Sequence, residues 1–251
     1  MTKTSVIVQA RMGSTRLPGK VLMPLGGRTV IDQVIRRCQN IARADEVCIA
    51  TTVLPRDDDL VEAGRSQGAL IFRGDEQDVL SRYYLAAREM KCDRILRVTS
   101  DCPLIDATVC DEVLDLMEAR GADYACNFTP PSFPHGLDCE AFTMAALEDM
   151  QNSAEDAFSR EHVTVWLIDN PEARKVSLRL PEGDWSCHRW TLDTQEDFDF
   201  LSRLFNRLPA ESEKLTWMQL MRLVQDDPEL LAASERKAHP ESAFVDGRQA
   251  D

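Results

Sequence analysis

Short apolar runs alternate with amphipathic stretches along the first half of the chain. Four runs are rich in β-branched residues, as buried strands are, and they cover residues 5–8, 46–51, 69–72 and 94–99. Between them, apolar residues recur at three- and four-residue spacing. This spacing predicts helices that begin after Thr29, over 57–67 and 78–91, and after Asp106. Strands separated by helices of this length predict a parallel sheet with right-handed crossovers.

The pattern changes at about Gly121. We expect further strands at 123–126, 139–143 and 175–180, and further helices at 158–168, 194–207 and 216–225. Residues 127–138 contain three prolines and predict a long irregular loop, a kind of segment that is usually functional or disordered. The sequence therefore predicts one α/β domain over residues 1–233, with a mixed and mostly parallel sheet. A polar tail over 234–251 follows, and we expect it to be poorly ordered.

Composition narrows the class of protein. With 43% hydrophobic and 29% charged residues, and no apolar run near the roughly 18 residues that a membrane span needs, we expect no membrane span. The first residues lack an apolar signal segment, so we expect a cytoplasmic protein. The eight cysteines include no Cys-x-x-Cys pair, which argues against a zinc ribbon or a thioredoxin-like site.

Residues 9–20 form a glycine-containing basic loop directly after the first strand. Glycines allow backbone amides to approach an anion, and Arg11, Arg16 and Lys20 suit phosphate oxygens. Residues 1–31 hold five basic and no acidic side chains, in a chain whose net charge is −14. A cationic pocket in an acidic protein favours a compact anionic ligand over nucleic acid. The alternative is a solvated basic edge.

Two well-known phosphate loops do not fit this segment. A Walker loop has four residues between its glycine and the Gly-Lys pair, and a Ser or Thr after the lysine. Here Gly13 and Gly19 are separated by five residues, and Val21 follows Lys20. The Gly-x-Gly-x-x-Gly pattern of dinucleotide-binding proteins is also missing, so neither class is indicated.

Asp101 and Asp193 are candidate metal ligands. Each follows a strand-like apolar segment, and Mg²⁺ binds through one or two carboxylates together with phosphate oxygens and water. The carboxyl ends of parallel strands meet at one sheet edge, so the two residues could converge although 92 positions separate them. The alternative is coincidence, because the chain has 43 acidic residues.

Several blocks of sequence together resemble one family. They are Val8–Lys20, Ile49–Thr52, Phe72–Tyr83, Arg97–Asp106, Gly136–Glu140, Arg160–Thr164 and Leu192–Asp197. In this order they resemble the SpsF-like cytidylyltransferases. These are related to the enzymes that make CMP-activated sialic, legionaminic, pseudaminic and ketodeoxyoctonic acids.

The resemblance implies a Rossmann-like nucleotide-diphospho-sugar transferase fold, similar to that of GT-A enzymes. It also implies transfer of CMP from CTP to a small sugar, an acidic or amino sugar for a surface polysaccharide or glycan, with release of pyrophosphate. Residues 1–120 would then bind the nucleotide and residues 121–233 the acceptor. Related enzymes often form homodimers, so a homodimer is expected.

The resemblance also implies site residues. Arg11, Lys20, Asp101 and Asp193 would be catalytic, and the two aspartates would hold Mg²⁺ or Mn²⁺. The nucleotide would contact Gln9, Ala10, Arg11, Gly13, Ser14, Arg16, Lys20, Ala50, Thr51 and Ser100, with Gln9, Ala50 and Thr51 at the base. The acceptor would contact Arg73, Arg82, His135, Asp138, Glu140, Arg160 and His162.

Some of these residues have a second interpretation. Asp138 could simply hold a turn, His162 could be a core histidine, and Arg73 and Arg82 could pair with Asp75 and Asp78. Cys102 has no adjacent base to activate it as a nucleophile, so packing is favoured. Trp185 and Trp190 flank a region that could cover the site, but core packing is favoured for them as well.

Two other functions are also compatible with a fold of this kind. A glycosyltransferase would need an Asp-x-Asp metal pair, which the segment Asp101-Cys102-Pro103 does not supply. A regulatory protein that binds nucleotide without turnover is the second, and the presence of both Asp101 and Asp193 argues against it.

Overall fold

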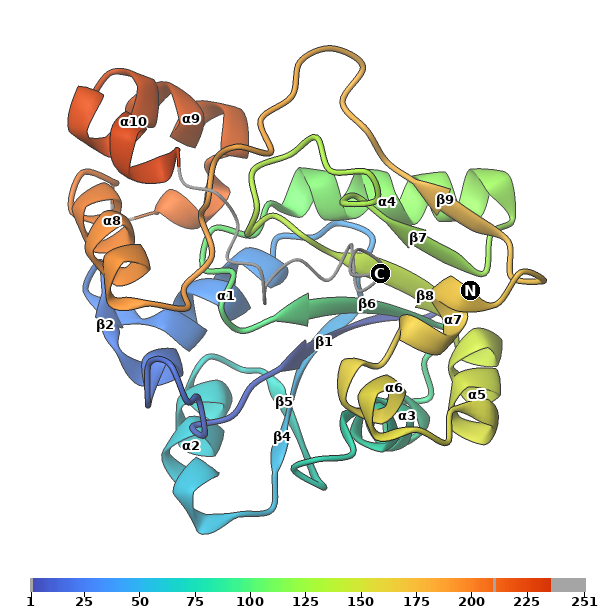
Figure 1. The fold of residues 1–251 in the computed structure, drawn as a ribbon. Coiled ribbons are helices and arrows are strands. Elements are labelled where there is room, and N and C mark those ends of the chain that lie inside the picture. Colours follow the sequence, from blue (N-terminus) through green and yellow to red (C-terminus); the bar gives the residue numbers. More distant parts are fainter. Residues whose placement is uncertain (1, 210, 236–251) are drawn as a thin grey trace, which may run out of the picture.

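The computed structural model describes residues 2–209 and 211–235, and its centre is a seven-stranded sheet (Figure 1). The strands are β1 (Thr4–Gln9), β4 (Glu46–Thr52), β5 (Leu70–Gly74), β6 (Arg94–Thr99), β7 (Tyr124–Cys126), β8 (Glu140–Thr143) and β9 (Lys175–Ser177). Their order is β5-β4-β1-β6-β8-β7-β9. Strand β8 runs antiparallel to both of its neighbours, β6 and β7, whereas the other pairings are parallel. The predicted mixed, mostly parallel sheet is confirmed.

Helices cover both faces of the sheet. The α-helices of the described chain are α1 (Val30–Cys38), α2 (Asp58–Ser66), α3 (Val79–Met90), α4 (Ala107–Arg120), α5 (Met144–Ser153), α6 (Ala157–His162), α7 (Val165–Asp169), α8 (Gln195–Phe205), α9 (Trp217–Gln225) and α10 (Pro228–Ser234). A two-stranded hairpin of β2 (Pro24–Leu25) and β3 (Arg28–Thr29) precedes α1.

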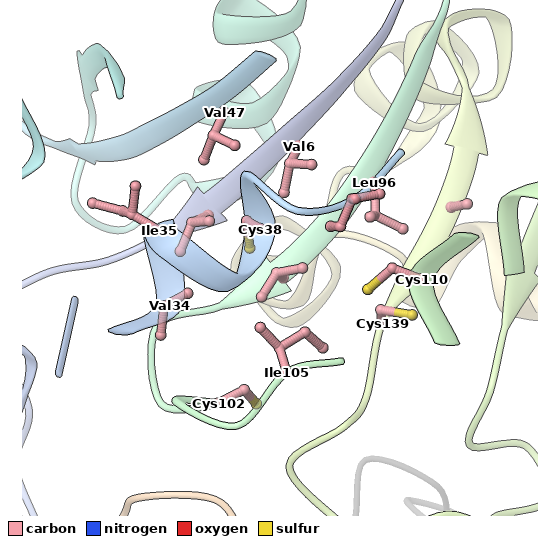
Figure 2. Packing of buried hydrophobic residues seen from close by; sticks show 14 of the residues in the cluster. Val6, Val34, Ile35, Cys38, Val47, Leu96, Cys102, Ile105, Cys110 and Cys139 are labelled. Carbon is pink, nitrogen blue, oxygen red and sulfur yellow. The ribbon is translucent and has the colours of Figure 1, made fainter. Parts of the chain in front are cut away.

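Alternating side chains of β1 divide the core in two. Val6 and Val8 point to the face covered by α1, α2 and α4, while Ile7 points to the face covered by α3 and α5. Both faces are therefore apolar, and β1 reads as a continuous apolar run. Figure 2 shows Val6 and Leu96 of the sheet over Val34 and Ile35 of α1.

A third apolar cluster joins the C-terminal helices to the body. Trp190 is fully buried and packs with residues of α8, α9 and α10 and with Leu25 of the hairpin. Its packing role is therefore confirmed. The cluster fixes the segment that follows Trp190, which carries Asp193, against the loop that follows β1.

Three expectations differ from the structure. The helix expected over 158–168 is broken into α6 and α7 at Val163, whose φ is 65°, and the turn brings Thr164 Oγ1 within 2.6 Å of Glu140. Strand β9 ends at Ser177 rather than at residue 180. Ser234 lies in α10 and is fully buried, so the tail prediction is wrong there. Residues 236–251 of the expected tail lie outside the described residues.

The remaining strand and helix predictions of the first half are confirmed to within one or two residues at their ends. Helices α5 and α10 and the β2–β3 hairpin were not predicted. In the described part of the chain, no helix is both long and apolar enough to cross a membrane.

Candidate active site

A cavity of about 660 Å³ opens at the carboxyl ends of β1 and β6. The loop after β1 forms one wall and residues 191–193 form another, while the proline-rich loop and α6 close the opposite side. Predicted site residues that line it are Gln9, Ala10, Arg11, Gly13, Ser14, Arg16, Lys20, Arg82, Ser100, Asp101, His135, Asp138, Glu140, His162 and Asp193. Most of the predicted set is therefore brought to one cavity.

Lys20 brings the two predicted aspartates together. Its Nζ donates to Asp193 Oδ1 at 2.9 Å, to Asp101 Oδ2 at 3.3 Å and to the Leu192 carbonyl oxygen at 2.7 Å. The predicted convergence of Asp101 and Asp193 is confirmed, although the sequence did not predict the lysine between them.

The charges at this end of the cavity stabilise one another. Burial alone would raise the pKa of Asp101, but the nearby Lys20 ammonium and a hydrogen bond from Thr99 outweigh it and lower this pKa to about 2. The same carboxylates raise the pKa of Lys20 above its usual value, against the opposing effect of burial. Asp101 and Lys20 are therefore both ionised at neutral pH.

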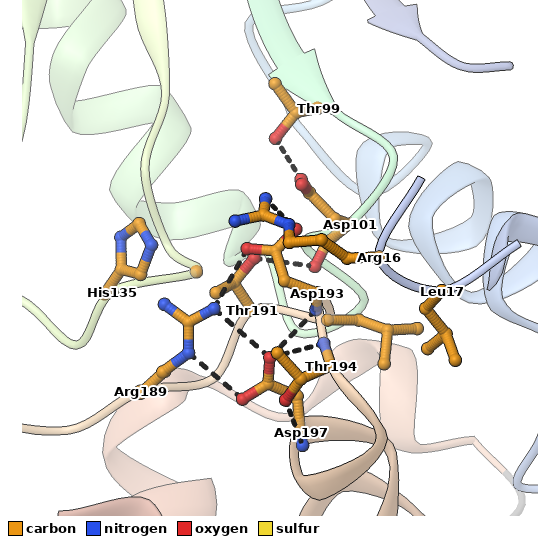
Figure 3. A network of polar contacts seen from close by, with 12 residues as sticks. Arg16, Leu17, Thr99, Asp101, His135, Arg189, Thr191, Asp193, Thr194 and Asp197 are labelled. Carbon is orange, nitrogen blue, oxygen red and sulfur yellow. Dashed lines mark hydrogen bonds and ion pairs between the residues drawn. The ribbon is translucent and has the colours of Figure 1, made fainter. Parts of the chain in front are cut away.

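Asp193 also accepts from two guanidinium groups. Arg16 lies 3.1 Å from its Oδ1, and Arg189 Nη2 donates to its Oδ2 at 2.9 Å (Figure 3). Arg189 in turn donates through Nε to Asp197 Oδ1 at 3.0 Å, and Asp197 Oδ2 accepts from the backbone N–H of Asp193 at 2.9 Å. Arg189 and Asp197 thus hold both the side chain and the backbone of Asp193.

The conformation of the basic loop depends on local backbone contacts. The Met12 N–H donates to Asp57 Oδ1 at 2.8 Å, and the Met12 carbonyl oxygen accepts from Ser14 and Gly19. Gly19 has a φ of 71°, which favours glycine, and it precedes the short 3-10 helix η1 (Lys20–Leu22) that directs Lys20 inward. These contacts close the loop around the cavity mouth.

His135 and Asp138 form an ion-pair geometry on the proline-rich loop. His135 Nδ1 lies 2.6 Å from Asp138 Oδ2, which also accepts from the Gly136 N–H at 3.1 Å. Burial lowers the pKa of His135, but the hydrogen bond and charge of Asp138 outweigh it, so the net pKa is raised. Asp138 therefore holds a turn, as the alternative interpretation expected, and it also faces the cavity.

A buried polar network lies at the far end of the cavity, where Glu140 pairs with Arg97. The other carboxylate oxygen of Glu140 accepts from Tyr124 at 2.7 Å and from Thr164 at 2.6 Å. His162 lies at the same end, and burial lowers its pKa. Both oxygens of Glu140 already have partners, so this carboxylate supports the cavity wall.

Four predicted residues do not line the cavity. Ala50 and Thr51, near the end of β4, are completely buried. Arg73 donates to the Thr52 and Leu54 carbonyl oxygens and pairs with Asp58, and Arg160 pairs with Asp78. The two arginines thus brace neighbouring segments. Arg82 does line the cavity, and its Nη1 donates to the Asp75 carbonyl oxygen at 2.8 Å.

Sequence reasoning missed several residues of the site. They include Arg97, Thr99, Glu161, Arg189 and Thr191, of which all but Arg189 line the cavity. For Arg97 a signal was present, since a basic residue in the middle of a buried strand needs a partner. Arg189 had no such signal.

Comparison with known proteins agrees with this geometry. A model of the family described as "Cytidylyltransferase" matches residues 5–235. The chain belongs to the cytidylyltransferase family. This enzyme is therefore a CTP-dependent nucleotidyltransferase.

Three relatives of this cytidylyltransferase are informative. The spore coat polysaccharide biosynthesis protein SpsF of Bacillus subtilis is 33% identical over 92% of this chain and 97% of its own. The 3-deoxy-manno-octulosonate cytidylyltransferase of Escherichia coli is 26% identical over 88% of this chain and 84% of its own. A cytidylyltransferase structure from Leptospira borgpetersenii superposes with a TM-score of 0.88 at 29% identity, covering 95% of this chain and all of the other. The resemblance seen in the sequence is confirmed.

Proposed function

We propose that this cytidylyltransferase transfers CMP from CTP to a hydroxyl group of an acidic or amino sugar, with Mg²⁺ or Mn²⁺, for a surface polysaccharide or glycan. The observation that carries the proposal is the cluster of Arg16, Lys20, Asp101 and Asp193 at one end of a cavity large enough for a nucleotide and a sugar. The relatives named for 3-deoxy-manno-octulosonate and for spore coat polysaccharide support a sugar acceptor.

The donor set suits a magnesium ion that is completed by substrate. Asp101 and Asp193 each direct a carboxylate oxygen at the same position, where both accept hydrogen bonds from Lys20 Nζ. Mg²⁺ needs only one or two protein carboxylates, because phosphate oxygens and water complete its coordination. In the described residues no group of three or more His, Cys, Asp or Glu side chains forms a metal site, so these two aspartates are the candidates. When bound, the metal would neutralise charge on the triphosphate.

Different residues would stabilise the transferred phosphate and position the acceptor. The oxygen of the acceptor hydroxyl group would attack the α-phosphorus and release its proton to solvent. The bond between the α-phosphorus and the oxygen that bridges to the β-phosphate would break, and pyrophosphate would leave with that oxygen. Arg11, Arg16 and Lys20 would offset the charge that builds on the phosphate oxygens, which fixed cations do at no reorganisation cost. His135 and Asp138, at the opposite wall, would position the acceptor.

A glycosyltransferase is not favoured by the geometry. Asp101 and Asp193 come from two separate segments, and Asp101 is followed by Cys102 and Pro103 rather than by an Asp-x-Asp pair.

Pyrophosphate release tests the proposal. The enzyme would be incubated with Mg²⁺, each nucleoside triphosphate in turn, and a panel of sugars and sugar phosphates. We expect release with CTP and an acidic or amino sugar, and release with GTP or UTP but never with CTP would refute the base assignment. Chelation of the metal should abolish release.

Variants of the aspartates test the metal assignment. Asp101→Asn and Asp193→Asn should each lose at least about a hundredfold in rate, since removing one transition-state contact costs about 3 kcal/mol. Asp59→Asn, at an exposed position on α2, is the matched control. Full activity in both site variants would show that the metal assignment is wrong.

A further inference from the structure

Asp57 is a fully buried carboxylate to which the proposed reaction assigns no role. It is the last residue of the short 3-10 helix η2 (Pro55–Asp57), in the turn after β4, and its exposed fraction is 0%. A buried carboxylate is costly unless it is paired or hydrogen-bonded. Among the described residues, no cationic side chain forms an ion pair with Asp57. Its burial must therefore be explained by its hydrogen bonds.

The place of Asp57 in the sequence predicts a local role that the structure does not show. Asp57 directly precedes α2, at the N-cap position, where an aspartate usually accepts a hydrogen bond from the first turn of its own helix. Its side chain forms no bond of this kind with the described backbone of α2. Instead, its Oδ1 accepts from the Met12 N–H at 2.8 Å, and its Oδ2 accepts from the hydroxyl group of Thr52. The carboxylate therefore acts on the basic loop rather than on its own helix.

Met12 is the residue through which this contact reaches the basic loop. Its N–H donates to Asp57, and its carbonyl oxygen accepts from the Gly19 N–H at 3.3 Å. Met12 thus connects the beginning of the loop to its end. Arg11 directly precedes Met12, and Lys20 directly follows Gly19. A shift of the Met12 backbone would therefore move both of these cations.

The Asp57 carboxylate is itself held in place. The Thr52 hydroxyl group that donates to it also accepts from the Leu54 N–H at 3.2 Å. Arg73 donates to the carbonyl oxygens of Thr52 and Leu54, at 2.8 and 2.9 Å. These contacts fix the turn after β4, so Asp57 presents its Oδ1 to Met12 from a braced segment.

We propose that Asp57 is a positioning residue, whose carboxylate holds the Met12 N–H and thereby keeps the basic loop in the conformation that binds the triphosphate. Ordering a loop when its ligand binds costs conformational entropy, and a loop that is already ordered avoids this cost. This inference rests on the proposed function, because it assumes that the loop binds the triphosphate.

Asp57→Ala removes the acceptor, and the affinities for CTP and for cytidine measure the consequence. With Mg²⁺ present, the affinity for CTP should fall at least about tenfold, because the loop is no longer held. Cytidine has no phosphate groups, so its affinity should stay within about twofold of wild type. Asp59→Ala, at an exposed position on α2, removes the same charge nearby and should bind both ligands as wild type does.

Asp57→Asn is the conservative variant. Its amide oxygen can still accept from the Met12 N–H, and its amide nitrogen can donate to the Thr52 hydroxyl group. Its affinity for CTP should therefore stay within about threefold of wild type. A charge effect on the nucleotide would instead give Asp57→Asn and Asp57→Ala the same affinity, and that result would refute the positioning role.

Circular dichroism and thermal unfolding check that the variants are folded. If Asp57→Ala does not fold, Thr52→Val decides, because it removes the hydroxyl group that orients the carboxylate but leaves the carboxylate itself. Its affinity for CTP should fall at least about threefold while its affinity for cytidine is unchanged. An unchanged affinity for CTP in Thr52→Val would then overturn the proposal.

The outcomes separate this inference from the proposed function. If wild type binds CTP and folded Asp57→Ala binds it equally well, or loses CTP and cytidine to the same extent, the role of Asp57 is overturned while the proposed function stands. If wild type binds no CTP, the proposed function fails and this inference fails with it.

Discussion

Asp197 offers the sharpest test of how the site is held together. Its carboxylate is 1% exposed and accepts hydrogen bonds from Arg189 Nε at 3.0 Å, from Arg189 Nη2 at 3.2 Å, and from the backbone N–H groups of Asp193 and Thr194 at 2.9 Å each. Asp197→Asn keeps the shape of the side chain but removes its charge and one acceptor oxygen. In this variant Arg189 keeps its ion pair with Asp193 but loses the ion pair with Asp197.

The expected cost follows from these contacts. Breaking a buried ion pair costs about 3–5 kcal/mol, and the amide oxygen of asparagine can still accept part of the lost bonds, so we expect a destabilisation of about 2–4 kcal/mol. Urea unfolding at pH 7 measures it. Asp199→Asn is the matched control. Asp199 is exposed on the same helix and accepts a hydrogen bond from Gln195 Nε2 at 2.8 Å, so its replacement should change stability by no more than about 0.5 kcal/mol.

The stability that the Asp197 carboxylate contributes should depend on pH in one direction. Burial would raise the pKa of Asp197, but the hydrogen bonds and charge of Arg189 outweigh it, and the pKa is lowered. A carboxyl group with a lowered folded-state pKa stabilises the fold above its unfolded pKa of about 3.9, and this contribution is lost as pH falls through the folded-state value. The difference between wild type and Asp197→Asn should therefore shrink in acid. Equal stabilities for Asp197→Asn and Asp199→Asn at pH 7 would refute the reasoning.

Two further predictions concern the walls of the cavity. Gly136→Ala should lower the free energy of unfolding by at least about 2 kcal/mol more than Gly27→Ala. Both glycines have a positive φ, but a Cβ at Gly136 would approach the backbone of Trp190 and Thr191 to 2.6 Å, whereas a Cβ at Gly27 would meet nothing within 4 Å. Similar shifts of the unfolding midpoint in both variants would contradict this prediction. Tyr124→Phe should cost about 1–2 kcal/mol in urea unfolding, since it removes a buried hydrogen bond to the Glu140 carboxylate, whereas Tyr84→Phe should cost little. Equal costs for the two tyrosines would show that the Glu140 network does not contribute.

The pattern of apolar residues predicted most of the fold. Strand β1 and its neighbours are apolar on both faces, and their flanking helices have clear stripes, so local signals agree with the tertiary arrangement. The exceptions have long-range causes. The break at Val163 places Thr164 against Glu140, which lies more than twenty residues away in the sequence, and no local signal encodes that contact.

The sequence predicted those site residues whose charged side chains directly follow a predicted strand. Arg16 and Lys20 follow a strand in a segment without acids, and Asp101 and Asp193 each follow a strand-like run. Arg189 lies in a polar segment and acquires its role only because folding brings it between Asp193 and Asp197.

Ala50 and Thr51 illustrate the converse case. They were correctly placed at the carboxyl end of a strand, yet they are completely buried and do not line the cavity. The depth of a residue below a sheet edge depends on how neighbouring loops pack, which the strand pattern does not contain.

We propose that the basic loop binds the triphosphate, and the affinities of Arg16→Met for CTP and for cytidine test this role most directly. Arg16 is partly exposed and lies at the cavity end that holds Asp193, so its replacement leaves the core untouched. Arg65→Met, which removes an exposed guanidinium paired with Glu62, is the control. With Mg²⁺ present, the affinity for CTP should fall at least about tenfold, as loss of a charge-assisted hydrogen bond of about 1.5–3 kcal/mol requires, while binding of cytidine stays unchanged. An unchanged affinity for CTP, or equal losses for CTP and cytidine, would contradict the claim.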